Sequence, residues 1–207
     1  MKTSTHFLQW LTVVLLLSVN AMDTMAQGPS TPGDYSVCLT GISEPYRVTD
    51  VASSTFAWSV LSGVSGTDWV LTSTSPNNNN IEVLWKTPGT YKLQVIETNS
   101  NLCPGTPVTI QVTVNALPIA PTKVNVTECF DGNVHTGSAT AGAGESIVWY
   151  DAATGGNIIT APSGTAPGTY TAYAGSKNNT TNCESSARTL VTVTIHPQVN
   201  TSPIYHN

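Results

Sequence analysis

Hydrophobic and polar residues alternate along most of the chain, in short runs that turn-forming residues separate. The runs cover residues 35–39, 45–49, 55–60, 81–85, 91–95 and 108–114 in the first half, and 146–150, 169–173 and 189–195 in the second. A period of two places alternate side chains on opposite faces of a strand. No segment beyond the first 26 residues keeps the 3.6-residue apolar period of a helix. The pattern therefore predicts an all-β fold.

One spaced pattern of residues occurs twice along the chain. The shared positions, first copy then second, are Cys38 and Cys129, Trp58 and Trp149, the Pro-Gly-Thr-Tyr sequences at 88–91 and 167–170, and Cys103 and Cys183. Each tryptophan follows its first cysteine by 20 positions, and an alternating run closes each copy. Two copies of one small β-module account for most of the chain, and modules of this kind on an exported chain usually bind or space other molecules.

The repeat and the proline positions divide the chain. Pro118 and Pro121 frame a short connection that no strand should cross, because proline cannot donate to a ladder. About seven short strands per copy, with frequent turn signals, predict two tandem immunoglobulin-like β-sandwiches. The predicted segments are a signal peptide (1–26), a flexible leader (27–33), a first β-sandwich (34–116), a Pro-rich linker (117–121), a second β-sandwich (122–197) and a C-terminal tail (198–207).

The N-terminal segment has the features of a secretory signal peptide. Lys2 supplies the positive charge, residues 11–19 form a short apolar run, and Thr24 and Ala26 place small residues before a cleavage site. The apolar run is shorter than the roughly 20 residues that span a bilayer. We therefore expect an exported protein with no membrane span after cleavage.

Composition and motifs narrow the class of function. Only 9% of residues are charged and the net charge is −5, which argues against nucleic acid as a partner. His135 stands alone, with no nucleophile–base arrangement near it in the sequence. Residues 131–133 (Asp-Gly-Asn) lack the carboxylates that follow in a calcium loop and are expected to form a turn. We predict no catalytic residue, metal ligand or cofactor, and hence no enzyme.

Four cysteines in an exported chain indicate disulfides, and four allow three pairings. Because each copy repeats the same two positions, Cys38–Cys103 and Cys129–Cys183 are the favoured pairs. The other pairings stay open, since a bridge needs Cα atoms within about 7 Å. In a strict immunoglobulin topology the two positions of each pair could lie at opposite ends of the sandwich.

The two copies differ in one segment. Trp58 and Pro88 are 30 positions apart whereas Trp149 and Pro167 are 18 apart, so the first copy carries 12 additional residues. Aromatic side chains dominate binding hot spots, so a tryptophan in this insertion is a candidate contact for a partner or a glycan, although it could instead fill one end of the sandwich. The candidate contacts are Trp69, Asn77, Asn78, Asn79 and Asn80 in the insertion and the outward-facing Tyr173 in the second copy.

Several of these stretches resemble a known family. Residues 148–156 (Val-Trp-Tyr-Asp-Ala-Ala-Thr-Gly-Gly), 167–170 and 182–188 (Asn-Cys-Glu-Ser-Ser-Ala-Arg) resemble the immunoglobulin-like modules of large Bacteroidetes surface proteins, over about residues 121–197. Residues 56–60 and 83–91 resemble the PKD-like modules of the same proteins, over about residues 34–116. The resemblance implies an envelope or cell-surface protein tied to gliding motility, adhesion or type IX secretion.

The resemblance also shapes the expected function. Cargo of that secretion route usually ends in a sorting domain, whereas ten residues follow Pro197 here. We therefore expect a protein that stays in the periplasm or outer membrane, or that reaches the surface bound to a larger adhesin or outer-membrane component. The predicted function is that of a non-enzymatic accessory or structural protein acting by protein–protein binding; the alternative is a carbohydrate- or surface-binding adhesion module.

Overall fold

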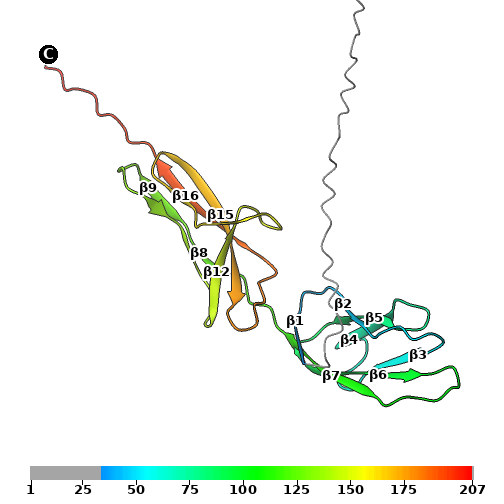
Figure 1. Ribbon diagram of the computed structural model, residues 1–207. Coiled ribbons are helices and arrows are strands. Elements are labelled where there is room, and N and C mark those ends of the chain that lie inside the picture. The colour runs from blue at the N-terminus through cyan, green and yellow to red at the C-terminus, as the bar shows by residue number, and fades with distance from the viewer. Residues whose placement is uncertain (1–33, 207) are drawn as a thin grey trace, which may run out of the picture. The chain divides into compact units, whose positions relative to one another are not determined.

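The computed structural model describes residues 34–206, and all regular structure in that range is β-strand (Figure 1). The predicted all-β fold is confirmed. The predicted signal peptide and leader lie outside the described residues. Strands β1–β7 pair only with one another, as do β8–β16, and we call the two groups module 1 (residues 35–115) and module 2 (residues 122–196). Residues 116–121, between them, belong to no strand.

Module 1 is a sandwich of two sheets. Its strands are β1 (Tyr35–Cys38), β2 (Glu44–Arg47), β3 (Thr55–Val60), β4 (Trp69–Ser73), β5 (Asn80–Trp85), β6 (Gly89–Thr98) and β7 (Val108–Asn115). One sheet has the order β1-β7-β6-β3 and the other β2-β5-β4. Only β1 and β7 run parallel; the other neighbours are antiparallel. Seven strands split four and three between two sheets are typical of an immunoglobulin-like sandwich.

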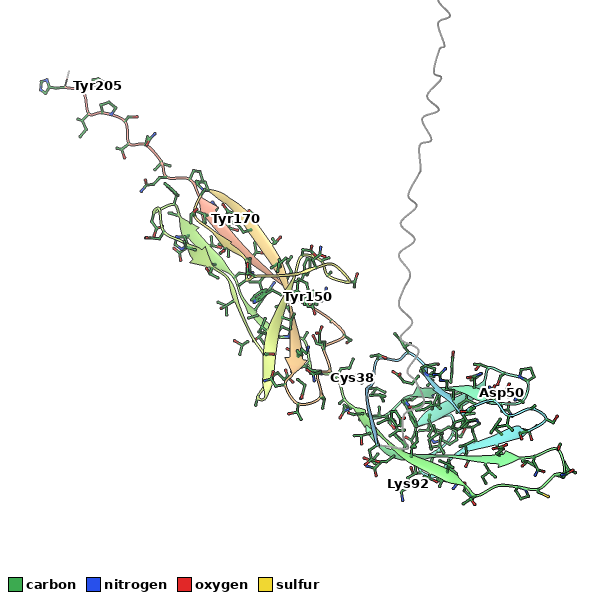
Figure 2. The ribbon with its side chains drawn as sticks, viewed as in Figure 1. Cys38, Asp50, Lys92, Tyr150, Tyr170 and Tyr205 are labelled. Carbon is green, nitrogen blue, oxygen red and sulfur yellow. A yellow bond between two sulfur atoms is a disulfide. The ribbon has the colours of Figure 1, made fainter. Side chains whose placement is uncertain are left out.

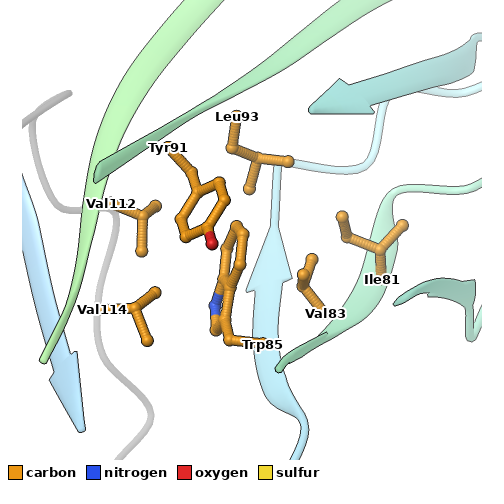
Figure 3. Packing of buried hydrophobic residues seen from close by; sticks show 7 residues of the cluster. All are labelled: Ile81, Val83, Trp85, Tyr91, Leu93, Val112 and Val114. Atoms are coloured by element: carbon orange, nitrogen blue, oxygen red, sulfur yellow. The ribbon is translucent and has the colours of Figure 1, made fainter. Parts of the chain in front are cut away.

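The core of module 1 is formed by alternate residues of three of the runs that the sequence pattern predicted as strands (Figure 3). The main buried cluster consists of Ile81, Val83 and Trp85 from β5, Tyr91 and Leu93 from β6, and Val112 and Val114 from β7. The rings of Trp85 and Tyr91 stack with centroids 4.8 Å apart, and Tyr46 meets Trp85 edge-on at 6.5 Å. Burial of each large apolar side chain of this core stabilises the fold by about 1.5–3 kcal/mol, because its surface is removed from water.

Module 2 has one large sheet and smaller strand pairs. Its strands are β8 (Thr122–Val124), β9 (Val126–Cys129), β10 (His135–Thr136), β11 (Ser138–Thr140), β12 (Glu145–Tyr150), β13 (Ile158–Ile159), β14 (Ser163–Gly164), β15 (Gly168–Asn178) and β16 (Thr189–His196). The large sheet has the order β13-β12-β15-β16-β9, and the pairs are β8–β11 and β10–β14. Gly137, between β10 and β11, packs on β16, where a Cβ would lie 2.7 Å from Val191 Cγ1.

The additional residues of module 1 form a strand of its second sheet. β4 pairs with β5 in module 1, whereas in module 2 the strand that follows β12 is the short β13, which pairs back with β12 in the large sheet. The longer segment therefore adds an edge strand to the sheet opposite β6 and β7.

The repeated Pro-Gly-Thr-Tyr sequence forms the same contact in both modules. The Tyr91 hydroxyl donates to the Thr87 carbonyl at 3.0 Å, and the Tyr170 hydroxyl, labelled in Figure 2, donates to the Ala166 carbonyl at 3.1 Å. In both modules the acceptor lies four residues upstream of the tyrosine. A tyrosine that bonds backbone a few residues upstream is the tyrosine corner of immunoglobulin-like folds. The sequence pattern alone had indicated only a turn and a strand here.

Candidate functional site

A disulfide joins Cys38, at the end of β1, to Cys183, in the turn before β16; the two Cα atoms are 5.6 Å apart and the residues 145 positions apart. It is a covalent link between module 1 and module 2. Cys103 and Cys129 are free and exposed. The expected pairing within each module is therefore wrong.

The strand register explains why the two cysteines of module 1 do not meet. Cys38 lies beside Asn115, the last residue of β7. Cys103 lies in the turn that precedes β7. The eight residues of β7 rise about 3.3 Å each, so roughly 23 Å separate its two ends. A disulfide spans at most about 7 Å between Cα atoms, so a bridge inside the module is excluded.

Cys38 and Cys129 occupy the same position in their modules, which we call the closing end because the last strand ends there. Cys38 pairs with Asn115 in parallel register, and Cys129 pairs with His196 in the same way. In each module the residue after the cysteine extends the backbone hydrogen bonding to the last strand. The Leu39 amide donates to the Asn115 carbonyl at 2.9 Å, and the Phe130 amide to the His196 carbonyl at 2.8 Å.

Cys103 and Cys183 also occupy matching positions, at what we call the hairpin end of each module. Each lies in the turn before the last strand and follows a residue with φ of +60°, Leu102 or Asn182. An asparagine side chain organises each turn: the Asn99 Oδ1 accepts from the amide of Cys103, and the Asn178 Oδ1 accepts from the amides at 180 and 181. The Cys103 carbonyl accepts from the Asn99 amide, as the Cys183 carbonyl does from Asn178.

Two of the three stretches that carry the family resemblance in module 2, residues 148–156 and 182–188, meet beside Cys183. The Arg188 guanidinium lies 3.2 Å from the centre of the Tyr150 ring and donates to the carbonyls of Ala152 and Gly155. The Tyr150 hydroxyl donates to Glu184 at 2.6 Å. Burial, and then the Glu184 carboxylate, raise the pKa of Tyr150. These contacts hold the segment that follows Cys183 against the turn after β12 and so position the bridged cysteine.

Trp69 and the asparagine run lie at opposite ends of the β4–β5 hairpin. Trp69 is opposite Trp85 in the register, is half-buried, and donates its indole N–H to the Ser62 carbonyl at 3.1 Å. It packs against the core of module 1. Residues 77–80 form the far turn, whose end is marked by the pairing of Ser73 with Ile81. The structure does not bring these candidate contacts together into one surface.

The asparagines of this turn have partners within the module. The Asn77 side chain donates to Asp50 at 2.6 Å, and the carbonyl of Asn78 accepts from the Trp58 indole at 2.7 Å. The Asn80 amide donates to the Ser75 hydroxyl. These bonds shape the turn that joins β4 to β5.

Tyr173, the remaining candidate contact, lies on β15 of module 2 opposite Tyr150 and is half-buried. It belongs to a different module from Trp69 and the asparagine run, which are in module 1. The candidate contacts therefore come from two separate sheets.

The Asp131 segment forms a turn, as expected. The Asp131 carboxylate accepts from the amide and side chain of Asn133, both at 2.9 Å, and contacts His135 Nε2 at 2.9 Å. The hydrogen bonds from Asn133, and to a smaller extent the one to His135, hold the pKa of Asp131 well below its usual range. Within residues 34–206 no group of three or more His, Cys, Asp or Glu side chains is arranged to hold a metal ion. In the same range no helix is long and apolar enough to cross a membrane.

Residues 118–197 match the family described as "Ig-like domain CHU_C associated". The matched segment contains all of module 2 and less than half of the chain. It supports an immunoglobulin-like module in the second half, as the motifs around Trp149 and Cys183 had suggested. No curated protein matches the chain in sequence.

Solved structures of low sequence identity resemble the chain. The fibronectin(III)-like modules of CbhA from Clostridium thermocellum are 10% identical, with a TM-score of 0.37, and the match covers 87% of this chain and 98% of that one. The I67–I69 fragment of titin is 14% identical, with a TM-score of 0.37 and coverage of 80% and 63%. SGBP-B of Bacteroides ovatus, solved with a mixed-linkage heptasaccharide, is 17% identical, with a TM-score of 0.34 and coverage of 78% and 43%. These TM-scores are low, and no functional conclusion follows from them.

Proposed function

We propose that this chain is a non-enzymatic, exported structural protein of a bacterial cell-surface assembly, where it acts by binding a larger protein. The observation that carries the proposal is the Cys38–Cys183 bridge. Residues 116–121 already connect the modules along the chain, and the bridge is a second covalent connection between them. Two connections restrict relative motion far more than one short linker does. A pair of modules restrained in this way is suited to spacing or presenting a partner.

Other observations support the same proposal. A persistent disulfide requires an oxidising compartment, which fits export to the periplasm, outer membrane or cell surface. The match of residues 118–197 to an immunoglobulin-like family agrees with a binding module. We include in the proposal that module 1 is PKD-like and that the assembly is a Bacteroidetes adhesin, gliding or type IX secretion system. A larger surface adhesin or outer-membrane component is the proposed partner.

The test is affinity purification of the tagged chain from its own cell envelope. The wild-type chain is expected to recover a larger envelope protein above background. The matched control is the double variant Cys38→Ser/Cys183→Ser, which keeps both modules and removes only the bridge; we expect it to recover less of that protein. If the wild-type chain recovers no envelope protein above background, the proposal fails.

The alternative function is carbohydrate or surface binding through Trp69 and Tyr173. It has less support, because the Trp69 indole N–H is already bonded to Ser62 and Tyr173 lies in the other module. Binding to a polysaccharide panel that Trp69→Ala abolishes, while circular dichroism shows an intact fold, would favour this alternative over a structural role.

A further inference from the structure

Each module carries one cysteine at its closing end and one at its hairpin end. The bridge joins the closing end of module 1, at Cys38, to the hairpin end of module 2, at Cys183. The two free thiols are the complementary pair: Cys129 at the closing end of module 2 and Cys103 at the hairpin end of module 1. The chain therefore uses one closing-end and one hairpin-end cysteine in its own bridge and leaves one of each exposed.

We propose that Cys129 of one copy of this chain forms a disulfide with Cys103 of a second copy. This bond repeats between copies the link that Cys38 and Cys183 make within one chain. The contact is heterologous, because it joins two different ends, and each added copy leaves another pair of ends free. Copies linked in this way form an open, head-to-tail chain of modules. This inference goes beyond the proposed function, because the partner is a second copy of the same chain and not a larger envelope protein.

The local geometry of the free cysteines supports the bond. Cys129 has the same parallel register to the last strand as Cys38, and the ladder continues past both in the same way. At the hairpin end, the Cys103 Sγ lies 3.7 Å from the Asn101 carbonyl oxygen, and the Cys183 Sγ lies 3.9 Å from the Thr181 carbonyl oxygen. The sulfur atoms of the two turns thus lie over the carbonyl two residues upstream in both modules. The backbone around each free cysteine is therefore arranged like that around its bridged counterpart, although Cys183 is buried and Cys103 is exposed.

Both free cysteines are exposed, so a second copy can reach them without unfolding either module. Thiols that are exposed in an oxidising compartment form disulfides when a matching thiol is held nearby. The bridge already present shows that the two kinds of end are compatible, because a closing-end and a hairpin-end cysteine come within 5.6 Å at Cα. The structure holds no example of two closing ends or two hairpin ends joined to each other.

The oxidation balances with a small disulfide as the oxidant. The Cys129 thiol loses its proton, and the thiolate attacks one sulfur of the oxidant and releases the other as a thiolate. The Cys103 thiolate of the second copy then attacks the Cys129 sulfur of this mixed disulfide and displaces the remaining thiolate. One sulfur–sulfur bond forms between the copies and one breaks in the oxidant. Two cysteine protons and two electrons pass to the oxidant, which leaves as two thiols.

The test uses two single variants that each keep one kind of free end. Cys103→Ser retains only Cys129, and Cys129→Ser retains only Cys103. Each is incubated with oxidised and reduced glutathione at a protein concentration near the roughly millimolar effective concentration that a short linker provides. Species are then separated by electrophoresis without reductant and the disulfides are mapped by mass spectrometry. The double variant Cys103→Ser/Cys129→Ser, which keeps the Cys38–Cys183 bridge, is the monomeric control.

The wild-type chain is expected to form a ladder of dimers and longer species. Each single variant stays mostly monomeric, with a small amount of dimer, and an equimolar mixture gives a dimer and nothing longer. We expect about tenfold more dimer in the mixture than in either variant alone, with a Cys103–Cys129 peptide in the dimer band. That ratio corresponds to a preference of about 1.4 kcal/mol for the unlike ends.

Three results would overturn the inference. Equal dimer in the single variants and the mixture would mean indiscriminate thiol oxidation. A mixture that stays monomeric would mean that the unlike ends do not meet between copies. A wild-type monomer in which mass spectrometry maps a Cys103–Cys129 disulfide would mean that the two cysteines pair within one chain. Failure of any of these kinds leaves recovery of a larger envelope partner unaffected, so the two proposals are tested separately.

Discussion

Cys38 and Cys183 are bonded to each other although each shares its module with a free cysteine. The bond is possible because Cys38 lies at the end where β7 ends and Cys183 lies at the end where β16 begins. Those are the ends that residues 116–121 connect along the chain. Cys38 and Cys183 thus link the two modules, and the length of β7 excludes a bridge between Cys38 and Cys103 within module 1.

Removal of the bridge should loosen the pair of modules and leave each module folded. The double variant Cys38→Ser/Cys183→Ser avoids an unpaired thiol at the junction. Disulfides of this kind typically contribute about 2–4 kcal/mol, chiefly by restricting the unfolded chain. We expect a lower urea midpoint and, by small-angle X-ray scattering, a broader distribution of distances within the chain. An unchanged distance distribution would show that the bridge does not restrain the modules.

Ser176→Ala should stabilise module 2. The Ser176 hydroxyl is fully buried and, among the described residues, has no hydrogen-bond partner. A buried polar group without a partner costs about 1–3 kcal/mol, so its removal should raise the free energy of unfolding by about 1 kcal/mol. Ser185→Ala is the matched control, because the Ser185 hydroxyl accepts from the Ser176 amide and donates to the Ala187 carbonyl. It should destabilise the module in the same urea titration.

The tyrosine hydroxyl of each corner should stabilise its module. Tyr91→Phe and Tyr170→Phe remove the bonds to the carbonyls of Thr87 and Ala166 and keep the rings in place. A net loss of about 1 kcal/mol is expected for each, the usual contribution of one hydrogen bond. Tyr205→Phe, in the exposed C-terminal segment, should leave the free energy of unfolding unchanged. If all three substitutions are equally neutral in thermal melts, the corner bonds do not stabilise the fold.

Alkaline stability should depend on Tyr46. Burial raises the pKa of Tyr46 to about 12, against about 10 in an unfolded chain, although the Trp85 N–H that donates to its oxygen acts in the opposite direction. Because the folded state holds the proton more tightly, this stabilisation is complete below pH about 10 and is lost as the pH rises towards about 12. Since the ring is only partly buried, the loss should be at most roughly 2 kcal/mol.

The variant Tyr46→Phe isolates this effect, since it removes the Tyr46 hydroxyl and keeps every other titratable group. At neutral pH the variant should be less stable, because the Trp85 N–H loses its acceptor. Urea titrations between pH 9 and about 12 should show the difference between the two proteins narrowing as the pH rises. A constant difference across that range would contradict the raised pKa.

Much of the fold was predictable from local pattern. Alternation placed Ile81, Val83 and Trp85 on one buried face, because the side chains of a strand point to opposite faces in turn. The repeated Pro-Gly-Thr-Tyr sequence forms the same tyrosine contact in both modules, although the strand orders of their sheets differ. The match of residues 118–197 to an immunoglobulin-like family agrees with the motifs around Trp149 and Cys183.

The candidate contacts show which features the local sequence pattern does not predict. The position of Trp69 in a longer segment fits either an exposed anchor or a filled end of the sandwich. Its half-buried place beside Trp85, and its bond to Ser62, follow from the pairing of β4 with β5. Likewise, a run of asparagines predicts a turn but does not specify that the turn bonds Trp58 and Asp50. Such contacts depend on which strands become neighbours.

The cysteines show most clearly which features the sequence determines and which depend on the tertiary structure. Composition and the repeat were sufficient to predict a β-protein with a disulfide, because these features depend on residue type and spacing along the chain. The partner of each cysteine depended on the tertiary structure, since a period of two specifies the face of a strand and says nothing about which end of a sandwich a residue occupies. The parallel pairing of Cys38 with Asn115, and the turn that holds Cys183 before β16, place the two bonded cysteines at ends of different modules.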